Sequence, residues 1–277
     1  MSSTLEGAAP RPRTAPPPPR PGRPGRRWVS MLAIAVVLGW SFQQTGVGPG
    51  SLIAGRQGAA RLLAGFLTPD LSPDFLAVVA GAALETVHIS LAALVFAVLL
   101  GLPLAVLQAG NVAAPPAVRQ GARLLATALR GVPELLWALL FVATVGLGPA
   151  AGVYAIGLHG AGLLAKLCGE QLEAVDPAPI EALRLTGATR IGTTLLGIIP
   201  QARAGLASLL LYQWECNIRT ATVVGFVGGG GIGQALDLSL RLFRYPELST
   251  LVIAVLMLIL GVDTLSRLVR RRLGAAT

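Results

Sequence analysis

An acid, an amide and a base lie close together inside a stretch of the chain that is otherwise mostly apolar. Glu215, Asn217 and Arg219 fall within residues 205 to 227. Glu215 and Arg219 are four residues apart, so on a helix they share one face and can form an ion pair. An arginine guanidinium also matches two oxygens of an anionic group such as a carboxylate or a phosphate. The sequence leaves two interpretations open: the charges neutralise each other or bridge helices, or they line a pathway for an anionic solute.

A second charge pair has the same spacing in another apolar stretch. Lys166 and Glu170 are four residues apart within residues 151 to 170, and we expect them to pair on one helix face. His159 and His88 stand alone, and we interpret both as hydrogen-bonded packing residues. We find no metal-ligating cluster and no nucleophile with a base and an orienting acid, so we predict neither a metal site nor a catalytic residue.

A glycine cluster follows the first charged stretch. Three of its members satisfy the G-x-G-x-x-G spacing of a dinucleotide-binding loop. Glu247 lies at roughly the distance of the acid that such a loop requires, but it precedes an apolar run instead of ending one, and no Gly-Lys-Ser/Thr follows the glycines. Successive glycines let a backbone leave helical geometry where protein surrounds it. We therefore predict a helix break at Gly228, Gly229, Gly230, Gly231 and Gly233.

The composition indicates which elements must position these residues. Of the 277 residues, 53% are hydrophobic and only 13% are charged, and the mean hydropathy is +0.69. These values are typical of a membrane protein. The net charge of +9 comes mainly from arginines at the two flanks, 11 to 27 and 267 to 272. Neither flank has the interleaved aromatic or polar readers of a nucleic-acid surface, so we predict no nucleic-acid partner.

The apolar segments predict an all-α integral membrane protein with about six transmembrane helices, each close to the length that crosses a bilayer. A Pro- and Arg-rich tail, residues 1 to 27, is expected to be a disordered cytoplasmic segment. Residues 43 to 83 are expected to form a loop with one interfacial helix. The predicted spans are 28 to 43, 84 to 107, 124 to 147, 151 to 170, 205 to 227 and 248 to 266.

The arginine distribution predicts the orientation. Both arginine-rich flanks and the connections 108 to 123 and 171 to 204 fall on one side of the predicted spans. The positive-inside rule places that side in the cytoplasm, together with both termini.

The connection 171 to 204 is too polar to cross a membrane, yet it is patterned. Asp176 and Pro177 suit a helix start, and Gly187 suits the stop of a short helix. A second helical piece is expected from Ala188 to Ile199 and is expected to end at Pro200. Two short helices at a glycine break predict a cytoplasmic docking loop.

This loop carries a resemblance to a known family. Glu181-Ala182-Leu183, Gly187 and the closing Ile199-Pro200 resemble the E-A-A-x-x-x-G…I-x-L-P loop of permease subunits of bacterial ABC importers. Leu183, Gly197 and Ile199 depart mildly from that pattern. Further segments resemble the phosphonate-type branch of these permeases, and the resemblance covers Glu85 to Arg272. Those segments are Arg130 to Phe141, Val145 to Gly152, Gly162 to Glu170, Leu211 to Arg219 and Val224 to Gly233.

The resemblance implies a type I ABC importer permease domain over residues 84 to 272, in the bacterial cytoplasmic (inner) membrane. It implies a permease homodimer that docks through Glu181, Ala182, Gly187 and Pro200 onto an ATP-binding cassette subunit, which would bind ATP and Mg. An extracytoplasmic binding protein would deliver phosphonate or a related phosphorus oxyanion. Membrane lipid would cover the remaining surface, and the chain itself would not be an enzyme.

Two other functions stay open. The chain is a permease of the same kind for a different small solute, or it is a self-sufficient secondary transporter. Charged residues inside apolar spans and a broken glycine-rich segment also occur in such carriers. The secondary-transporter interpretation gives the loop 171 to 204 no role.

Overall fold

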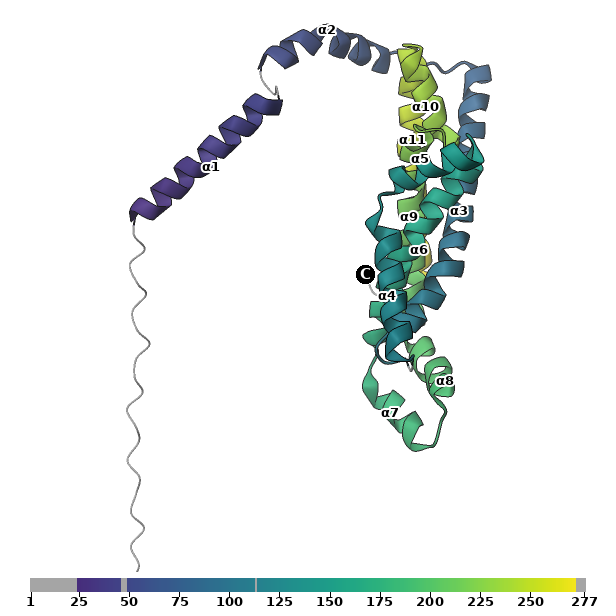
Figure 1. Cartoon of the computed structure of the whole chain (residues 1–277). Helices are drawn as coiled ribbons and strands as arrows, with labels where there is room; N and C mark the ends of the chain where they lie inside the picture. The colour runs from purple at the N-terminus through teal and green to yellow at the C-terminus, as the bar shows by residue number, and fades with distance from the viewer. Residues whose placement is uncertain (1–23, 46–48, 113, 273–277) are drawn as a thin grey trace, which may run out of the picture. The chain divides into compact units, whose positions relative to one another are not determined.

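The computed structural model describes residues 24–45, 49–112 and 114–272 (Figure 1). The chain divides into two compact units, residues 1–59 and 60–277. The first unit contains α1 (Pro24–Thr45), and α2 (Pro49–Phe66) begins in it and ends in the second. Most of the predicted disordered tail, residues 1 to 23, lies outside the described residues. Residues 24 to 27 do not continue that tail, because α1 already begins at Pro24.

The second unit is a helical bundle, and its described residues contain no strand. Its two short helices α7 and α8 lie at one end of the bundle, which we call the α7 end, and α10 lies toward the opposite end (Figure 1). The elements are α3 (Pro73–Gln108), α4 (Pro116–Gly131), α5 (Glu134–Val145), α6 (Pro149–Glu173), α7 (Pro177–Leu185), α8 (Arg190–Thr193), the π-helical turn η1 (Thr194–Ile198), α9 (Ile199–Gly225), α10 (Gly231–Arg241) and α11 (Tyr245–Arg272).

Helix α3 begins eleven residues earlier than the sequence indicated. Residues 73 to 83 were expected to be part of a loop because Pro73 and Asp74 interrupt the apolar pattern. In the structure Pro73 occupies the first helical position and Asp74 lies in the first turn. A proline there loses no hydrogen bond, and an acid there suits the helix dipole, so both residues start the helix.

The predicted span 124 to 147 is not one helix. It is divided between α4 and α5, which meet at an angle of 83° around Val132 and Pro133. Pro133 has no amide hydrogen, and its ring would clash with the carbonyl group four residues earlier. The prediction of a continuous helix was therefore wrong, and the proline was its available signal.

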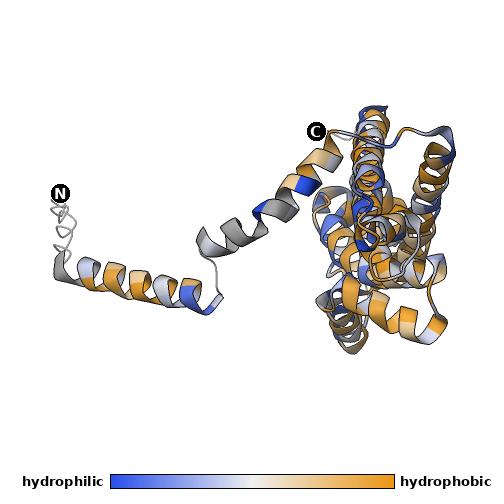
Figure 2. Cartoon of the chain, turned by 90° about the horizontal axis from the view of Figure 1, so that it is seen from above, coloured by the Kyte–Doolittle hydropathy of each residue, from blue (hydrophilic) through white to orange (hydrophobic). Residues whose placement is uncertain are grey.

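The described residues also contain fewer spans than the six predicted. Four helical stretches are long and apolar enough to cross a membrane, and a fifth results if the bent α4–α5 pair is counted as one span. Helix α1 contains the predicted span 28 to 43 but is not among them. Hydrophobic residues, orange in Figure 2, run along the bundle helices. The four stretches are Pro73–Gln108, Pro149–Glu173, Arg190–Gly225 and Tyr245–Arg272.

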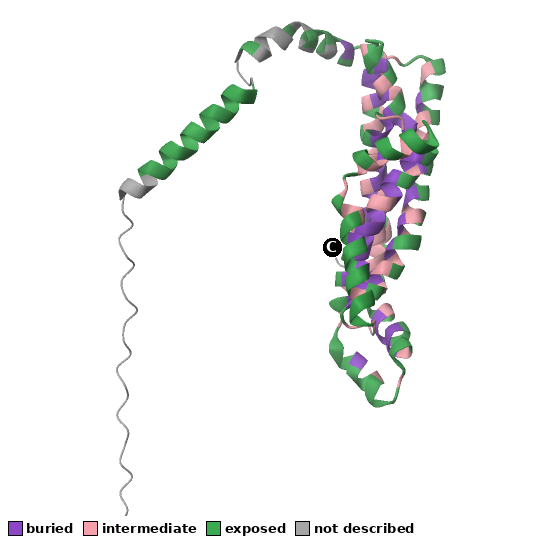
Figure 3. Cartoon of the chain, viewed as in Figure 1, coloured by how far each residue is buried: buried purple, intermediate pink, exposed green. Residues whose placement is uncertain are grey.

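The centre of the bundle is the packing of α3 against α6. The buried face of α6 consists largely of glycine and alanine, and its buried core appears in purple in Figure 3. A Cβ atom added to Gly101 of α3 would lie 2.8 Å from the carbonyl oxygen of Ala161. Small residues of this kind let helix backbones approach closely inside a membrane. The two helices thus form the frame on which the other spans are placed.

Candidate functional site

The predicted docking loop folds into a hairpin of α7 and α8, residues 177–193, which we call the α7–α8 hairpin. The Asp176 carboxylate accepts a hydrogen bond from the Ala178 amide at 3.0 Å and caps α7. After Leu185 the chain turns at Gly187, whose φ of +84° lies in the left-handed region that favours glycine. Thr189 caps α8 in turn, accepting a hydrogen bond from the Gly192 amide at 3.1 Å. Local capping therefore determines this hairpin.

One side of the hairpin is anchored and the other is free. Ile180 is buried in a cluster with Leu172 and Ile198, which fixes α7 to the ends of α6 and α9. Glu181 and Ala182 are exposed, and most of α7 is green in Figure 3. Two apolar side chains that the sequence analysis did not select are also exposed, Leu185 by 89% and Ile191 by 74%. The hairpin is therefore anchored on one side by Ile180 and presents exposed apolar side chains on the other.

Pro200 does not end the second helical piece as predicted. Helix α8, the π-helical turn η1 and α9 follow one another without interruption, so that Arg190–Gly225 is one continuous helical stretch. The Ile199 amide bonds to the Thr194 carbonyl oxygen, five residues earlier, and the Gln201 side chain donates to the Gly197 carbonyl oxygen at 3.0 Å. The wide turn and this side chain accommodate the proline, which explains why the helix continues.

A pocket of about 470 Å³ lies between the hairpin and the connection from α3 to α4. Three arginines line it: Arg119 from α4, Arg184 from α7 and Arg190 from α8. The base of the hairpin is therefore positively charged, a feature that requires residues from three separate helices.

The sequence suggested an ion pair between Glu215 and Arg219, but the structure does not contain it. The Glu215 carboxylate forms an ion pair with Arg270 of α11, and the Glu215 side chain is only 7% exposed. The pair joins the middle of α9 to the last turn of α11. Tertiary packing supplied a closer partner than the residue four positions away.

Asn217 lies in a hydrogen-bond network between α9 and α3. Its side-chain amide donates to the Ser90 carbonyl oxygen at 3.2 Å and accepts from Gln213 at 2.9 Å. Trp214 donates to the Ser90 hydroxyl group at 3.1 Å. This buried network attaches α9 to α3, and Asn217 has a structural role in it.

Arg219 is separate from both groups. Its residue is exposed on α9, and no ion pair or hydrogen bond joins its side chain to another residue in the described part of the chain. Of the three predicted pathway residues, the structure thus leaves only Arg219 available to a ligand.

The glycine cluster separates α9 from α10. Gly228, Gly230 and Gly231 have φ values of +95°, +83° and +69°, which other residues rarely adopt. The Gly228 carbonyl oxygen accepts a hydrogen bond from the Gly148 amide at 2.8 Å. A Cβ atom at Gly229 would lie 2.5 Å from Val224 Cγ1, and one at Gly233 would lie 2.0 Å from the Thr222 carbonyl oxygen. The glycines are therefore needed both for the turn and for close contact with neighbouring backbone.

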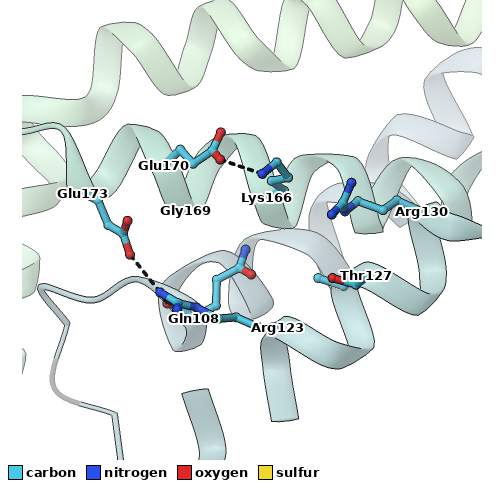
Figure 4. A pocket seen from close by; sticks show the side chains of 9 residues that line it. Gln108, Arg123, Thr127, Arg130, Lys166, Gly169, Glu170 and Glu173 are labelled. Carbon is cyan, nitrogen blue, oxygen red and sulfur yellow. Dashed lines mark hydrogen bonds and ion pairs between the residues drawn. The ribbon is translucent and has the colours of Figure 1, made fainter. Parts of the chain in front are cut away.

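Lys166 and Glu170 form the expected ion pair, with Nζ and Oε1 2.8 Å apart. Both border a pocket of about 240 Å³ between the end of α3, α4 and α6, which we call the α4–α6 pocket (Figure 4). Sequence reasoning missed this pocket because its residues come from three distant segments. It is lined by Gln108, Arg123, Ala126, Thr127, Arg130, Lys166, Gly169, Glu170 and Glu173.

His159 packs against the bend between α4 and α5. Its Nδ1 lies 3.0 Å from the Val132 carbonyl oxygen and its Nε2 lies 3.7 Å from Glu134 Oε2. Within the described ranges, no group of three or more His, Cys, Asp or Glu side chains is placed to hold a metal ion.

Comparison with protein families gives a match over most of this bundle. Residues 97–275 match the family described as "Binding-protein-dependent transport system inner membrane component".

Several curated relatives are similar to this chain over about two thirds of its length or more. The chain is 41% identical over 188 residues to the phosphite transport system permease protein PtxC of Stutzerimonas stutzeri, covering 68% of each chain. It is 36% identical over 239 residues to the putative phosphite transport system permease protein HtxC of the same organism, covering 86% of this chain and 82% of that protein. It is 37% identical over 192 residues to the phosphate-import permease protein PhnE of Mycolicibacterium smegmatis, covering 69% of this chain and 36% of that one.

Solved structures share the fold. The chain is similar to a chain of the MetNI methionine ABC transporter in inward facing conformations, with a TM-score of 0.65, 20% identity and coverage of 73% of this chain and 99% of that one. An amino acid ABC transporter solved with histidines gives a TM-score of 0.62 at 22% identity, covering 72% and 95%. These similarities confirm the predicted all-α permease fold of type I ABC importers.

Proposed function

The chain belongs to the family of binding-protein-dependent transport system inner membrane components, and we propose that the solute it carries is a phosphorus oxyanion. Membership makes it a multi-pass inner-membrane permease subunit of an ABC importer, and not an enzyme. The self-sufficient carrier considered from the sequence therefore has no support. The phosphite and phosphate importers among its relatives favour the phosphorus solute over other small molecules.

The observation that carries the proposal is that Arg219 is exposed and has no ion-pair partner among the described residues. A charge at the centre of a membrane span costs on the order of 2.5 to 3.5 kcal/mol on insertion scales, so it faces protein or water. Arg219 is exposed on α9 and has no ion-pair partner among the described residues, whereas Glu215 on the same helix is buried and paired. An anion in an aqueous pathway supplies the missing partner, and the guanidinium group can hold two of its oxygens.

The partners follow from the same architecture. The α7–α8 hairpin, with exposed Leu185 and Ile191, docks onto an ATP-binding cassette subunit that binds ATP and Mg²⁺. We infer that the α7 end faces the cytoplasm and that the extracytoplasmic binding protein delivers the solute at the opposite end. The arginine-rich flanks favour the cytoplasmic side for both termini as well. Exposed leucines along α3, α5 and α11 contact membrane lipid and a second copy of the chain.

Uptake of radiolabelled phosphite and phosphate tests the solute. The assay uses cells whose own uptake systems are deleted and which express the chain with its ATP-binding subunit and binding protein. One charge-assisted hydrogen bond contributes about 1.5 to 3 kcal/mol, so Arg219→Gln should lower uptake about 10- to 150-fold while the complex still assembles. Arg219→Lys keeps the charge but loses the two-oxygen contact, and it should retain part of the activity.

The control is Arg267→Gln, which removes an arginine paired with Asp263 at 3.0 Å on α11. It should leave uptake close to that of the wild type, because surface pairs contribute little. Wild-type cells that take up neither anion would refute the proposed solute. Unchanged uptake in Arg219→Gln would reject the role of Arg219 and leave the solute assignment intact.

A further inference from the structure

We propose that the α4–α6 pocket is a second site for the transported phosphorus oxyanion, at the α7 end of the bundle, with Arg130 as its main contact and Lys166 and Thr127 beside it. The inference rests on the proposed solute and adds a binding site that the solute meets before it leaves the permease. The site is distinct from Arg219, which lies on α9 and does not line this pocket.

One face of helix α4 carries two arginines that line the pocket. Arg123 and Arg130 are seven residues apart, two turns along one face, and both line the pocket with Ala126 between them. On the other side Leu124 and Leu125 are 62% and 50% exposed. In a helix next to lipid this arrangement keeps the guanidinium groups away from hydrocarbon and gathers them around one space.

Close packing holds the two helices in place around the pocket. A Cβ atom at Gly162 of α6 would lie 2.6 Å from the Arg130 backbone nitrogen, and one at Gly169 would lie 2.9 Å from Gln108 Nε2. The Gln108 side chain also donates to the Ala165 carbonyl oxygen. Backbone contacts and a buried hydrogen bond therefore fix the helices that carry the cations at a constant separation around the pocket.

The charges in the pocket do not balance. Arg123 pairs with Glu173 at 3.3 Å and Lys166 pairs with Glu170 at 2.8 Å, but Arg130 has no carboxylate partner among the described residues. Its Nε is buried without a hydrogen-bond partner. Figure 4 shows Arg130, Lys166 and Thr127 bordering the same space. A small oxyanion would satisfy the Arg130 donors and neutralise the excess positive charge.

The size of the pocket and its carboxylates indicate what it holds and how tightly. One water molecule occupies about 30 Å³, so a pocket of about 240 Å³ accommodates a tetrahedral oxyanion with part of its hydration shell. Glu170 and Glu173 repel an anion there, which lowers its affinity. A transported ion must bind well enough to enter and weakly enough to leave, and this mixture of charges meets both conditions.

The pocket lies beside the hairpin through which the ATP-binding subunit acts. Glu173 is the last residue of α6, and it accepts a hydrogen bond from the Gly110 amide at 2.5 Å as well as pairing with Arg123. Helix α7 begins four residues later, at Pro177. The Glu173 end of the pocket therefore lies next to the hairpin, and Arg130 lies further along α6, beside Gly162.

Direct binding tests the site. The full chain with its ATP-binding subunit is placed in nanodiscs of phosphatidylcholine, without nucleotide or binding protein, and binding of ³²P-phosphate is measured with unlabelled phosphite as competitor. Arg130→Gln should weaken the affinity about tenfold or more, since it removes charge-assisted hydrogen bonds. Glu170→Gln should strengthen it several-fold, because it removes a repelling charge and frees Lys166. Arg267→Gln is the matched loss of an arginine outside the pocket and should change nothing.

The opposite changes in phosphate affinity expected for Arg130→Gln and Glu170→Gln distinguish a binding site from a purely structural role of these residues. Equal affinity in wild type and Arg130→Gln overturns the inference, and so does a loss of affinity in Glu170→Gln. If Arg130→Gln fails to assemble with the ATPase, Arg130→Lys is used, which keeps the charge and should weaken binding by a smaller factor. Co-purification with the ATP-binding subunit in the wild-type ratio shows that each variant is folded and assembled.

Further outcomes show whether the second site or the proposed function has failed. If phosphate binds in phosphatidylcholine but is displaced when anionic phospholipid is included, the pocket holds a lipid headgroup, and the proposed second site is overturned. If wild-type cells take up phosphite while Arg130→Gln cells take it up equally fast, only the second site fails. Absence of uptake in the wild type instead refutes the proposed function on which the site rests.

Discussion

Replacing Arg270 by Gln should destabilise the bundle more than replacing Arg219, although Arg219 is the closer residue in the sequence. Arg270 forms the ion pair with Glu215, whose side chain is 7% exposed, and it connects the end of α11 to the middle of α9. Without Arg270 the Glu215 carboxylate stays buried with no compensating charge. Arg219 is exposed and takes no part in this pair.

The expected size follows from the burial of the pair. Two unit charges about 4 Å apart attract by about 4 kcal/mol at an effective dielectric constant of about 20. Removing one partner of a buried pair destabilises a protein by about 3 to 5 kcal/mol. Because the Arg270 side chain is 24% exposed, water relieves part of this cost, and we expect about 3 kcal/mol for Arg270→Gln. Arg219→Gln should change stability by less than about 0.5 kcal/mol.

The assay is unfolding of the purified chain in mixed micelles at increasing SDS fraction, for the wild type, the single variants and the double variants. Glu215→Gln combined with Arg270→Gln leaves two neutral groups, so the double variant should recover about 2 kcal/mol relative to the sum of the single effects. The matched cycle of Glu215→Gln with Arg219→Gln should show coupling below about 0.5 kcal/mol.

A larger coupling for Glu215 with Arg219 than with Arg270 would refute the assignment of the pair. If the losses in unfolding free energy are additive for both pairs, Glu215 with Arg270 and Glu215 with Arg219, then Glu215 is neutralised in another way. The first result would also remove the argument that Arg219 is available to a solute, because that argument depends on Glu215 not being paired with Arg219.

Two other predictions concern glycines and one concerns the amide network. Gly187→Val forces a β-branched residue to a φ of +84°, which costs about 1 to 2 kcal/mol or more. Co-purification of the ATP-binding subunit and uptake of the solute should therefore both fall. Normal association with the ATP-binding subunit would contradict the docking role of the hairpin. Gly233→Ala places a Cβ atom 2.0 Å from the Thr222 carbonyl oxygen and should destabilise the chain by about 1 to 3 kcal/mol in the SDS assay. The control Gly261→Ala has open space around it and should be neutral or slightly stabilising. Equal effects of the two substitutions would refute the packing argument. Asn217→Ala should cost about 0.5 to 2 kcal/mol through lost interhelical hydrogen bonds without changing the solute preference, and a changed preference would return Asn217 to the pathway.

The sequence was sufficient for features that depend on neighbouring residues. The apolar segments identified a helical membrane protein because each span must satisfy its own backbone within hydrocarbon. Asp176, Pro177 and Gly187 predicted the start and stop of α7, since capping and a positive φ are local requirements. The same local reasoning was available at Pro133, where the bend of 83° was missed because hydropathy alone was followed.

Only the tertiary structure decided which charged groups meet. Two pairs have the same i, i+4 spacing, Lys166–Glu170 and Glu215–Arg219, yet only the first forms an ion pair. The spacing permits a contact, but a competing partner can prevent it. Arg270, 55 residues from Glu215, is that competitor. The α4–α6 pocket likewise combines three segments that are far apart in sequence, so its excess positive charge exists only once the helices have packed.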